Sequence, residues 1–92
     1  MKLTLARPAR KPDVWVNLAR GENTLFDPDT GKVHLLNDTA LAIWDLCDGE
    51  TYPAEMLDAI CELCNMQPEV VSQDLERVLG EFQRAGLIEW VP

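Results

Sequence analysis

The sequence predicts a single α/β (α+β) domain in which an N-terminal three-stranded antiparallel sheet is followed by three helices. Two observations point to this class. The first 36 residues contain short runs of β-forming residues separated by turn residues. From residue 37 onward, apolar residues recur at helical spacing instead. With 92 residues, the chain is long enough for one compact core but not for a deep active-site cleft.

Residues 1–13 are predicted to form a basic tail, and residues 14–92 the folded domain. The tail mixes charges with Pro8 and Pro12 and shows no sustained apolar period. It also lacks the apolar stretch and small-residue cleavage site of a signal peptide. No apolar run in the chain approaches the roughly 20 residues that span a bilayer. We therefore expect a cytoplasmic protein with no membrane partner, whose tail is disordered, packs on the helices or contacts a partner.

Three strands are predicted before residue 37, at Val14–Leu18, Thr24–Asp27 and Lys32–Leu36. The segment Asp27-Pro28-Asp29-Thr30-Gly31 predicts a hairpin, because proline presets φ, aspartate caps the turn and glycine supplies the left-handed residue. Sequential strands usually pair as neighbours. The third strand is therefore expected at an edge of the sheet, with one row of backbone groups unpaired.

Two shorter helices are predicted next. Asn37 is a favourable N-cap for the first, and Asp48-Gly49 ends it. Thr51 is predicted to cap the second, with Pro53 tolerated in its first turn. The apolar positions of the two helices are Ala40, Ile43, Trp44 and Cys47, then Met56, Leu57, Ile60, Leu63 and Cys64.

The third helix has the clearest amphipathic pattern of the chain. Asn65 and Pro68 bracket the break before it, and Gly86 follows as a C-terminal cap residue. Its apolar stripe consists of Val71, Leu75, Val78, Leu79 and Phe82. Residues 87–91 are expected to form a closing strand or wing.

Charge divides the chain into two halves. Residues 1–36 carry six basic and four acidic side chains, a net charge of +2. Residues 37–92 carry two basic and twelve acidic side chains, a net charge of −10, which gives −8 for the whole chain. A strongly acidic helical half repels phosphate backbones and favours basic partners.

The cysteines and the single histidine do not predict a catalytic or metal site. An odd number of cysteines, Cys47, Cys61 and Cys64, in apolar patterns indicates reduced, buried thiols. The C-x-x-C pair, with Cys47 and His34, formally completes a Cys₃His metal set, but such thiols at helical spacing are usually core residues. No order or spacing suggests a nucleophile set around His34. We therefore expect no cofactor, no metal and no enzymatic activity.

Several motifs together resemble one known family. They comprise Phe26–Asn37, Thr39-Ala40, Ile43–Gly49, Asp74-Leu75, Leu79 and Gly86–Ile88. The most specific of them runs from Leu36 through Gly49. Over about two-thirds of the chain, from Leu25 to Ile88, the sequence resembles the PqqD family.

The resemblance implies a winged-helix-like domain, known as a recognition element for ribosomally synthesised and post-translationally modified peptides (RiPPs). Such domains are non-catalytic adaptors that bind the leader of a precursor peptide. They present it to a maturation enzyme, often a radical S-adenosylmethionine enzyme, in pyrroloquinoline quinone (PQQ) or related modified-peptide biosynthesis. The expected partners of this chain are therefore a precursor leader peptide and a maturation enzyme.

In the family, the leader lies between the third strand and the third helix. An edge strand can also accept an extended peptide on physical grounds alone. The candidate binding residues are Lys32, Val33, His34, Leu35 and Leu36 on the strand, and Asp74, Arg77, Val78 and Glu81 on the helix. Val33 and Leu35 share one strand face, and Lys32, His34 and Leu36 share the other. The sequence does not indicate which face meets the helix.

The alternative function is a winged-helix DNA-binding or regulatory module, whose third helix enters the major groove. That helix carries four acidic residues, Glu69, Asp74, Glu76 and Glu81, against Arg77 and Arg84. This balance opposes the phosphate neutralisation on which DNA affinity depends, so we expect no nucleic-acid partner.

Two further alternatives stay open. The protein is a monomer or a dimer, because an edge strand can also pair with a second copy. Trp15 and Trp90 are expected to pack, although an exposed tryptophan near a sheet edge can anchor a peptide or partner.

Overall fold

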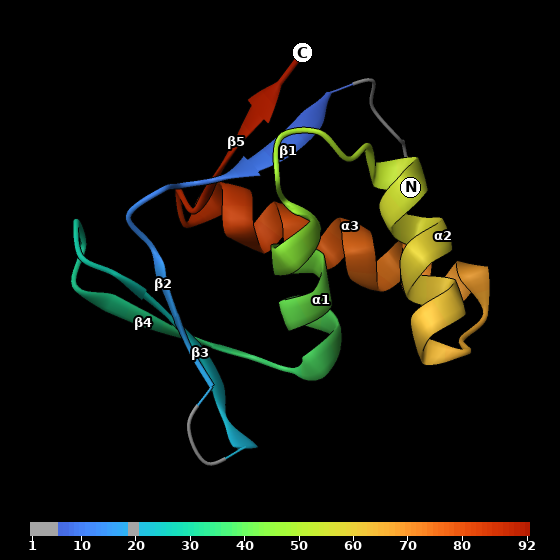
Figure 1. The fold of residues 1–92 in the computed structure, drawn as a ribbon, viewed down its shortest axis with the longest axis horizontal. Helices are drawn as coiled ribbons and strands as arrows, with labels where there is room; N and C mark the ends of the chain where they lie inside the picture. The colour runs from blue at the N-terminus through green and yellow to red at the C-terminus, as the bar shows by residue number, and fades with distance from the viewer. Residues whose placement is uncertain (1–5, 19–20) are drawn as a thin grey trace.

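The computed structural model describes residues 6–18 and 21–92. Its elements are β1 (Arg7–Arg10), β2 (Trp15–Asn17), β3 (Asn23–Asp27), β4 (Lys32–Leu36), α1 (Asp38–Leu46), α2 (Pro53–Cys64), α3 (Pro68–Arg84) and β5 (Ile88–Val91). The sheet β2-β3-β4 extends to one side of the three helices (Figure 1). The predicted α+β class, with an antiparallel three-stranded sheet before three helices, is confirmed.

The two ends of the chain form a second, two-stranded sheet. β1 pairs antiparallel with β5, with Arg7 opposite Val91 and Arg10 opposite Ile88 (Figure 1). The closing strand predicted over residues 87–91 is therefore confirmed. The predicted tail is wrong for Arg7–Arg10, where a strand forms and the Pro8 side chain is fully buried. Residues 1–5 of the predicted tail lie outside the described residues.

The second edge of β1 is bonded to the connection between α1 and α2. The Arg10 N–H donates to the Cys47 carbonyl at 2.8 Å, and the Gly49 N–H donates to the Pro8 carbonyl at 2.9 Å. Gly49 adopts a φ of 78°, and a Cβ there would lie 3.4 Å from the Ala9 Cβ. Glycine therefore suits the left-handed backbone conformation at this position.

β3 is the central strand of the three-stranded sheet. Phe26 pairs with Trp15 of β2 and with Val33 of β4, which fixes the register on both sides. The predicted hairpin is present between β3 and β4. Gly31 closes it with a φ of 72°, and its N–H donates to the Asp27 carbonyl at 2.8 Å.

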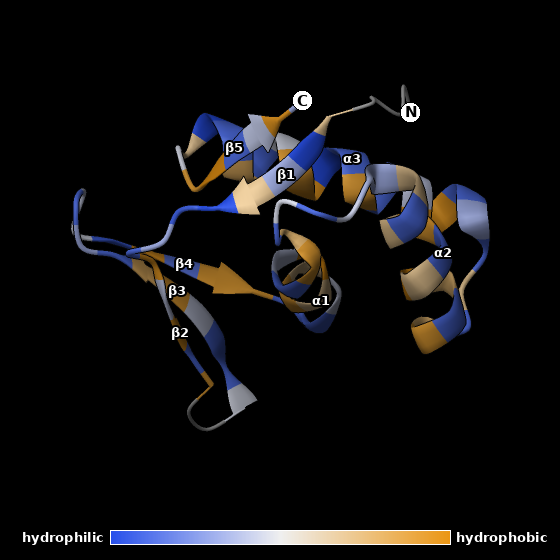
Figure 2. Ribbon diagram, turned by 45° about the horizontal axis from the view of Figure 1, so that its top comes forward, coloured by the Kyte–Doolittle hydropathy of each residue, from blue (hydrophilic) through white to orange (hydrophobic). Residues whose placement is uncertain are grey.

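The core lies between the inner face of this sheet and the three helices. The apolar stripe predicted for α3 is buried along its whole length, as are Leu25 of β3 and Leu36 of β4. Trp44 of α1 meets Phe82 of α3 edge-on, with ring centroids 5.3 Å apart. The hydrophobic end of β4 runs directly toward α1 (Figure 2). Each such buried side chain stabilises the fold by roughly 1.5–3 kcal/mol.

The helix boundaries follow the predicted signals with one correction. The Asn37 side chain caps α1 by accepting from the Ala40 N–H at 2.8 Å, as predicted. The cap of α2 is Tyr52 rather than Thr51, because the Asp48 carboxylate takes both the backbone N–H and the hydroxyl of Thr51. The Tyr52 N–H then donates to Glu55 at 2.9 Å.

The last turn of α2 extends beyond the core. Leu63 is 76% exposed and Cys64 is exposed, while Cys61 is half-buried. The prediction of three buried thiols is therefore correct only for Cys47. None of the helices in the described part of the chain combines the length and the apolar character needed to cross a membrane.

Candidate peptide-binding site

β4 forms one edge of the three-stranded sheet. Its inner neighbour is β3, and no further strand of the described residues pairs with its other side. The N-terminal strand β1 pairs with β5, away from this edge. A groove of about 300 Å³ lies between β4 and the C-terminal part of α3. Its lining consists of Val33, His34, Leu35 and Leu36 from β4, Glu81, Phe82 and Ala85 from the end of α3, and Leu87.

The burial pattern of β4 shows which face of the strand meets the helices. Leu36 is buried and His34 is half-buried, and the cross-strand partner of His34 is the fully buried Leu25. Val33 and Leu35, on the other face, are 64% and 73% exposed. The face that carries His34 and Leu36 therefore points toward the helices, which the sequence did not indicate.

The structure brings five of the nine candidate residues together around the groove. They are Val33, His34, Leu35, Leu36 and Glu81. Lys32 is exposed at the start of β4, opposite Asp27, outside the groove lining. Val78 is buried in the core and is not part of the groove lining.

The remaining two candidates, Asp74 and Arg77, lie on α3 outside the groove lining and form a charged chain with Glu81. Arg77 lies 3.6 Å from an Asp74 oxygen and 3.2 Å from a Glu81 oxygen. The guanidinium is thus held between two carboxylates at helical spacing. These pairs are about half exposed, so they contribute little to stability, and the Glu81 carboxylate remains available at the groove rim.

Three groove residues were missing from the predicted set: Phe82, Ala85 and Leu87. A signal for two of them exists, because Phe82 and Ala85 follow Val78 at i+4 and i+7 and share its helix face. The sequence does not encode the angle at which a strand crosses a helix. That angle decides which turn of a helix about 25 Å long meets a five-residue strand.

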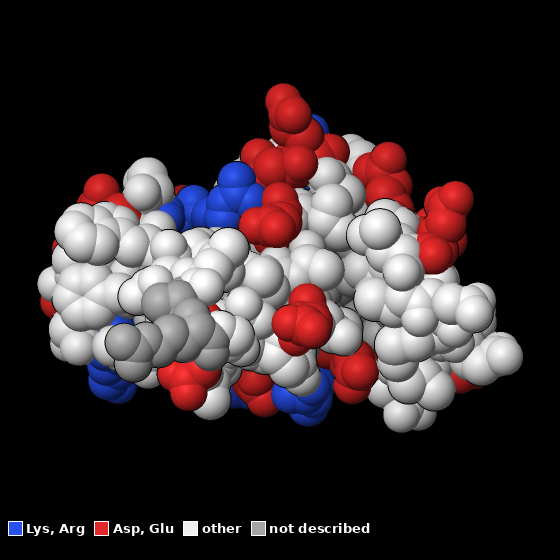
Figure 3. Space-filling model, turned by 60° about the horizontal axis from the view of Figure 1, so that its bottom comes forward, with Lys and Arg blue, Asp and Glu red and all other residues white. Residues whose placement is uncertain are grey.

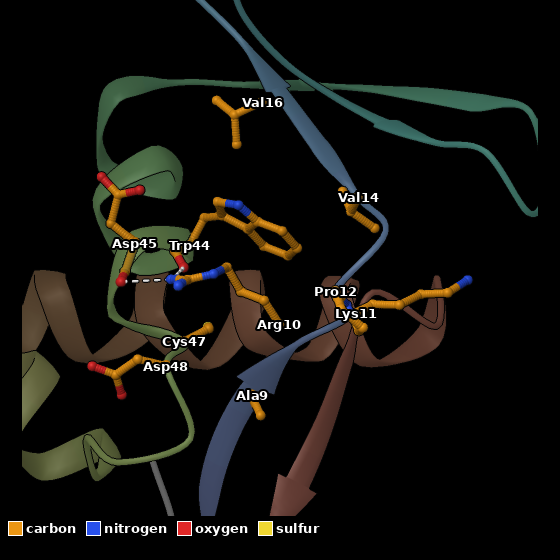
Figure 4. Close-up of a pocket in the computed structure, with 10 residues that line it drawn as sticks. All are labelled: Ala9, Arg10, Lys11, Pro12, Val14, Val16, Trp44, Asp45, Cys47 and Asp48. Carbon is orange, nitrogen blue, oxygen red and sulfur yellow. Dashed lines mark hydrogen bonds between the residues drawn. The ribbon is translucent and has the colours of Figure 1, made fainter.

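A second hollow, of about 410 Å³, lies between the connection from β1 to β2 and the end of α1 (Figure 4). The Arg10 guanidinium occupies one side of it, beside the Trp44 ring. It donates to the Trp44 carbonyl at 3.0 Å and the Asp45 carbonyl at 2.7 Å. A cation on the last carbonyls of a helix stabilises its C-terminus. Arg10 therefore has a structural role there.

Cys47 borders this second hollow, but its thiol is inert. Burial raises the pKa of Cys47 to about 12, and the nearby Arg10 charge only partly opposes this. The thiol therefore stays protonated near neutral pH, whereas a reactive cysteine needs an accessible thiolate. The described residues hold no cluster of three or more His, Cys, Asp or Glu side chains that could ligate a metal ion.

Lys11 ties the connection between β1 and β2 to the β3–β4 turn. Its ammonium lies 3.2 Å from a carboxylate oxygen of the buried Asp27 and 2.8 Å from one of Asp29. Burial alone would raise the pKa of Asp27, but the Asp29 N–H and the Lys11 ammonium outweigh it and lower this pKa. The Asp29 hydrogen bond is the largest cause of the raised pKa of Lys11. This network fixes the hairpin that carries β4.

The fold resembles three solved structures. TbiB1 in complex with the TbiA(beta) leader peptide is 26% identical, with 88% of this chain and 94% of that chain covered and a TM-score of 0.74. Lasso peptide synthetase B1 complexed with the leader peptide is 22% identical, with 91% and 99% covered and a TM-score of 0.74.

The third structure is the PqqD truncation of Methylobacterium extorquens PqqCD, described as a functional, stand-alone RiPP recognition element. It is 18% identical, with 97% of this chain and 94% of that chain covered and a TM-score of 0.75. No curated protein sequence matches the chain significantly. The family model for coenzyme PQQ synthesis protein D (PqqD) matches residues 22–88. The matched segment runs from just before β3 to the start of β5, so the chain belongs to the PqqD family.

Proposed function

We propose that this chain is a non-catalytic adaptor that binds the leader segment of a precursor peptide at β4 and presents it to a maturation enzyme. The observation that carries the proposal is the edge strand β4 beside a groove against α3. Family membership supports it, as does the similarity to TbiB1, which was solved in complex with a leader peptide. The matching family is named for PQQ synthesis, and one of the similar structures is a lasso peptide synthetase B1.

The leader adds antiparallel to β4 as a fourth strand. Main-chain hydrogen bonds along the edge supply affinity, and side-chain pockets supply specificity. Leader side chains on the inner face enter the groove, where Leu36, Phe82 and Leu87 offer apolar contacts. Glu81 at the rim favours a basic leader residue, in line with the acidic helical half.

The energetics suit a transient complex. Ordering a flexible peptide costs about 2–5 kcal/mol of the gross interaction. Micromolar binding, about −8 kcal/mol, is the scale expected for a short strand with one or two buried side chains. Such affinity lets the adaptor release the precursor after modification.

The composition of the groove supports binding rather than bond-making chemistry. Among the described residues that line it, His34 and Glu81 are titratable and the others are apolar. On α3, four acidic side chains outnumber Arg77 and Arg84, which disfavours the contact with nucleic-acid phosphates that a DNA-binding module needs.

The experiment uses a displayed library of random linear peptides, selected against the folded protein. An enriched peptide is then titrated into the ¹⁵N-labelled chain. We expect enrichment, and the largest chemical-shift changes at β4 and at the C-terminal part of α3. Shifts confined to other surfaces, or no enriched peptide at all, would contradict the proposal. A shifted duplex DNA probe at low salt would favour the DNA-binding alternative instead.

A further inference from the structure

The outer face of the three-stranded sheet is uncharged and partly exposed. By strand alternation and register it presents Trp15, Asn17, Thr24, Phe26, Val33 and Leu35, none of them charged. Trp15, Phe26 and Val33 form one row across the three strands, and Trp15 is 67% exposed. Figure 3 shows one side of the molecule, with acidic side chains along its upper edge and middle and mostly uncharged surface toward both ends.

The helices leave this face uncovered because they pack on the opposite one, where Leu25 and Leu36 are buried. Charged residues make up 26% of the chain, whereas all six side chains of this face are uncharged. Exposed apolar patches of this kind mark interaction sites.

The size of the face argues against a stable dimer built on it alone. A few side chains of this kind expose a few hundred Å². A stable protein–protein interface buries about 800 Å² per partner. The occupant that fits is therefore one whose contact continues beyond the face. Val33 and Leu35 lie on β4 and also border the groove, so the face runs without a break to the edge strand.

Resting on the proposed function, we propose that outward-facing side chains of the bound leader cover Val33 and Leu35. The leader is then recognised on both faces of the sheet. A strand beside β4 lies about 4.8 Å away, which places directly opposed side chains within about 5.5 Å of each other. Alternate leader residues therefore meet the groove and the outer face in turn.

This arrangement defines the class of leader that the site selects. A strand buried on only one face alternates apolar and polar residues, whereas a strand covered on both faces reads as a continuous apolar run. The preferred leader therefore carries about four consecutive apolar residues, two for each face. A basic residue next to this run would lie near Glu81 at the rim of the groove.

The aromatic pair behind Val33 lies outside the proposed contact. Phe26 and Trp15 lie one and two strands further from the edge, beyond direct reach of most leader side chains. Their ring centroids are 6.0 Å apart, and Phe26 is the cross-strand partner of Val33. Trp15 therefore serves as an internal control, since it shares the face but not the proposed contact.

The test measures binding of the selected library peptide to Val33→Thr and Leu35→Thr. Threonine keeps β-propensity, and both positions are exposed in the free protein, so we expect unchanged melting temperatures. Loss of the apolar contact should weaken binding about three- to tenfold at each position. In the wild-type complex we expect intermolecular nuclear Overhauser effects between peptide side chains and the methyl groups of both residues.

The matched controls are Leu63→Thr and Trp15→Thr. Leu63 is 76% exposed on α2, close to the 73% exposure of Leu35, and lies outside the groove lining. Both controls should bind within about twofold of the wild type, because neither side chain takes part in the proposed contact.

The outcomes separate the two proposals. Peptides that bind at β4 with polar residues at the outward positions, and bind Val33→Thr and Leu35→Thr normally, would overturn this inference and leave the adaptor function standing. An equal loss in Trp15→Thr would also overturn it, because the effect would then come from the sheet and not from contact. Failure of any peptide to bind at β4 would overturn the adaptor function itself.

Discussion

The two sheets of this molecule treat their strand edges in opposite ways. β1 is bonded on both sides, to β5 and to the connection between α1 and α2. β4 is bonded on one side only among the described residues, and its other side borders the groove against α3. An unpaired edge invites association with other chains, so natural folds usually cover it. Under the proposed function, the covered edge serves stability and the uncovered edge serves binding.

The largest expected effect lies at the covered edge. Arg10→Pro removes the N–H that bonds to the Cys47 carbonyl and the guanidinium that caps α1. We expect the free energy of unfolding to fall by about 3 kcal/mol, measured by urea denaturation. Arg10→Lys is the control, because it keeps the backbone bond and a cation. Ordinary surface substitutions change the free energy of unfolding by up to about 0.5 kcal/mol. A loss below about 1 kcal/mol for the proline variant would therefore contradict this view of β1.

At the uncovered edge the same substitution should affect binding instead of folding. Proline is introduced separately at Val33, His34 and Leu35, whose N–H groups point alternately toward β3 and toward the free edge. Where the N–H faces the free edge, we expect an unchanged melting temperature and about tenfold weaker peptide binding. Where it faces β3, the melting temperature should fall. Thermal denaturation measures the melting temperatures, and calorimetric titration of the folded variants measures peptide binding. Three variants that bind like the wild type would exclude strand addition.

A smaller effect is expected from charge at the groove rim. Glu81→Gln should weaken binding of a peptide with a basic residue beside its apolar run by up to about fivefold at low salt. The loss should shrink as salt is added, because exposed charges are screened. Asp74→Asn, one acidic residue outside the groove lining on the same helix, is the matched control. Equal losses in both variants, or a loss independent of salt, would argue against direct contact with Glu81.

The smallest expected effect concerns the pH dependence of the hairpin that carries β4. The folded-state pKa of Asp27 is lowered below its ordinary 3.8, so its ionised form stabilises the fold above that pH. This contribution should be lost as pH falls through the folded-state pKa. We expect wild type to melt above Asp27→Asn at neutral pH, and the difference to narrow below about pH 3.8. A constant difference across this range would contradict a role for the Asp27 charge.

Local signals in the sequence were enough for most of the fold. Proline, aspartate and glycine at Asp27–Gly31 predicted the hairpin, and the apolar stripe of α3 predicted its buried face. The edge position of β4 followed from simple neighbour pairing. These features depend on turn chemistry and periodicity within a few residues, which a single sequence displays directly.

The features that the sequence did not predict depend on contacts between distant segments. β1 is four residues long, contains a proline and finds its partner at the other end of the chain. Leu63 continues the apolar pattern of α2, yet the helix runs past the core, so this residue is exposed. Asp74 and Arg77 were predicted to border the groove, whereas the structure has Phe82 and Ala85 there. The angle between β4 and α3 decides this, and the apolar periodicity of a helix does not encode that angle.

The most direct test of the adaptor account is residue-resolved amide hydrogen exchange of β4 with and without the selected peptide. If the leader adds as a strand, the amides of alternate residues among Val33, His34 and Leu35 become slower to exchange on binding. The neighbouring amides, already bonded to β3, change little. Protection that appears only on α3, or equally at all positions of β4, would contradict addition of a strand at this edge.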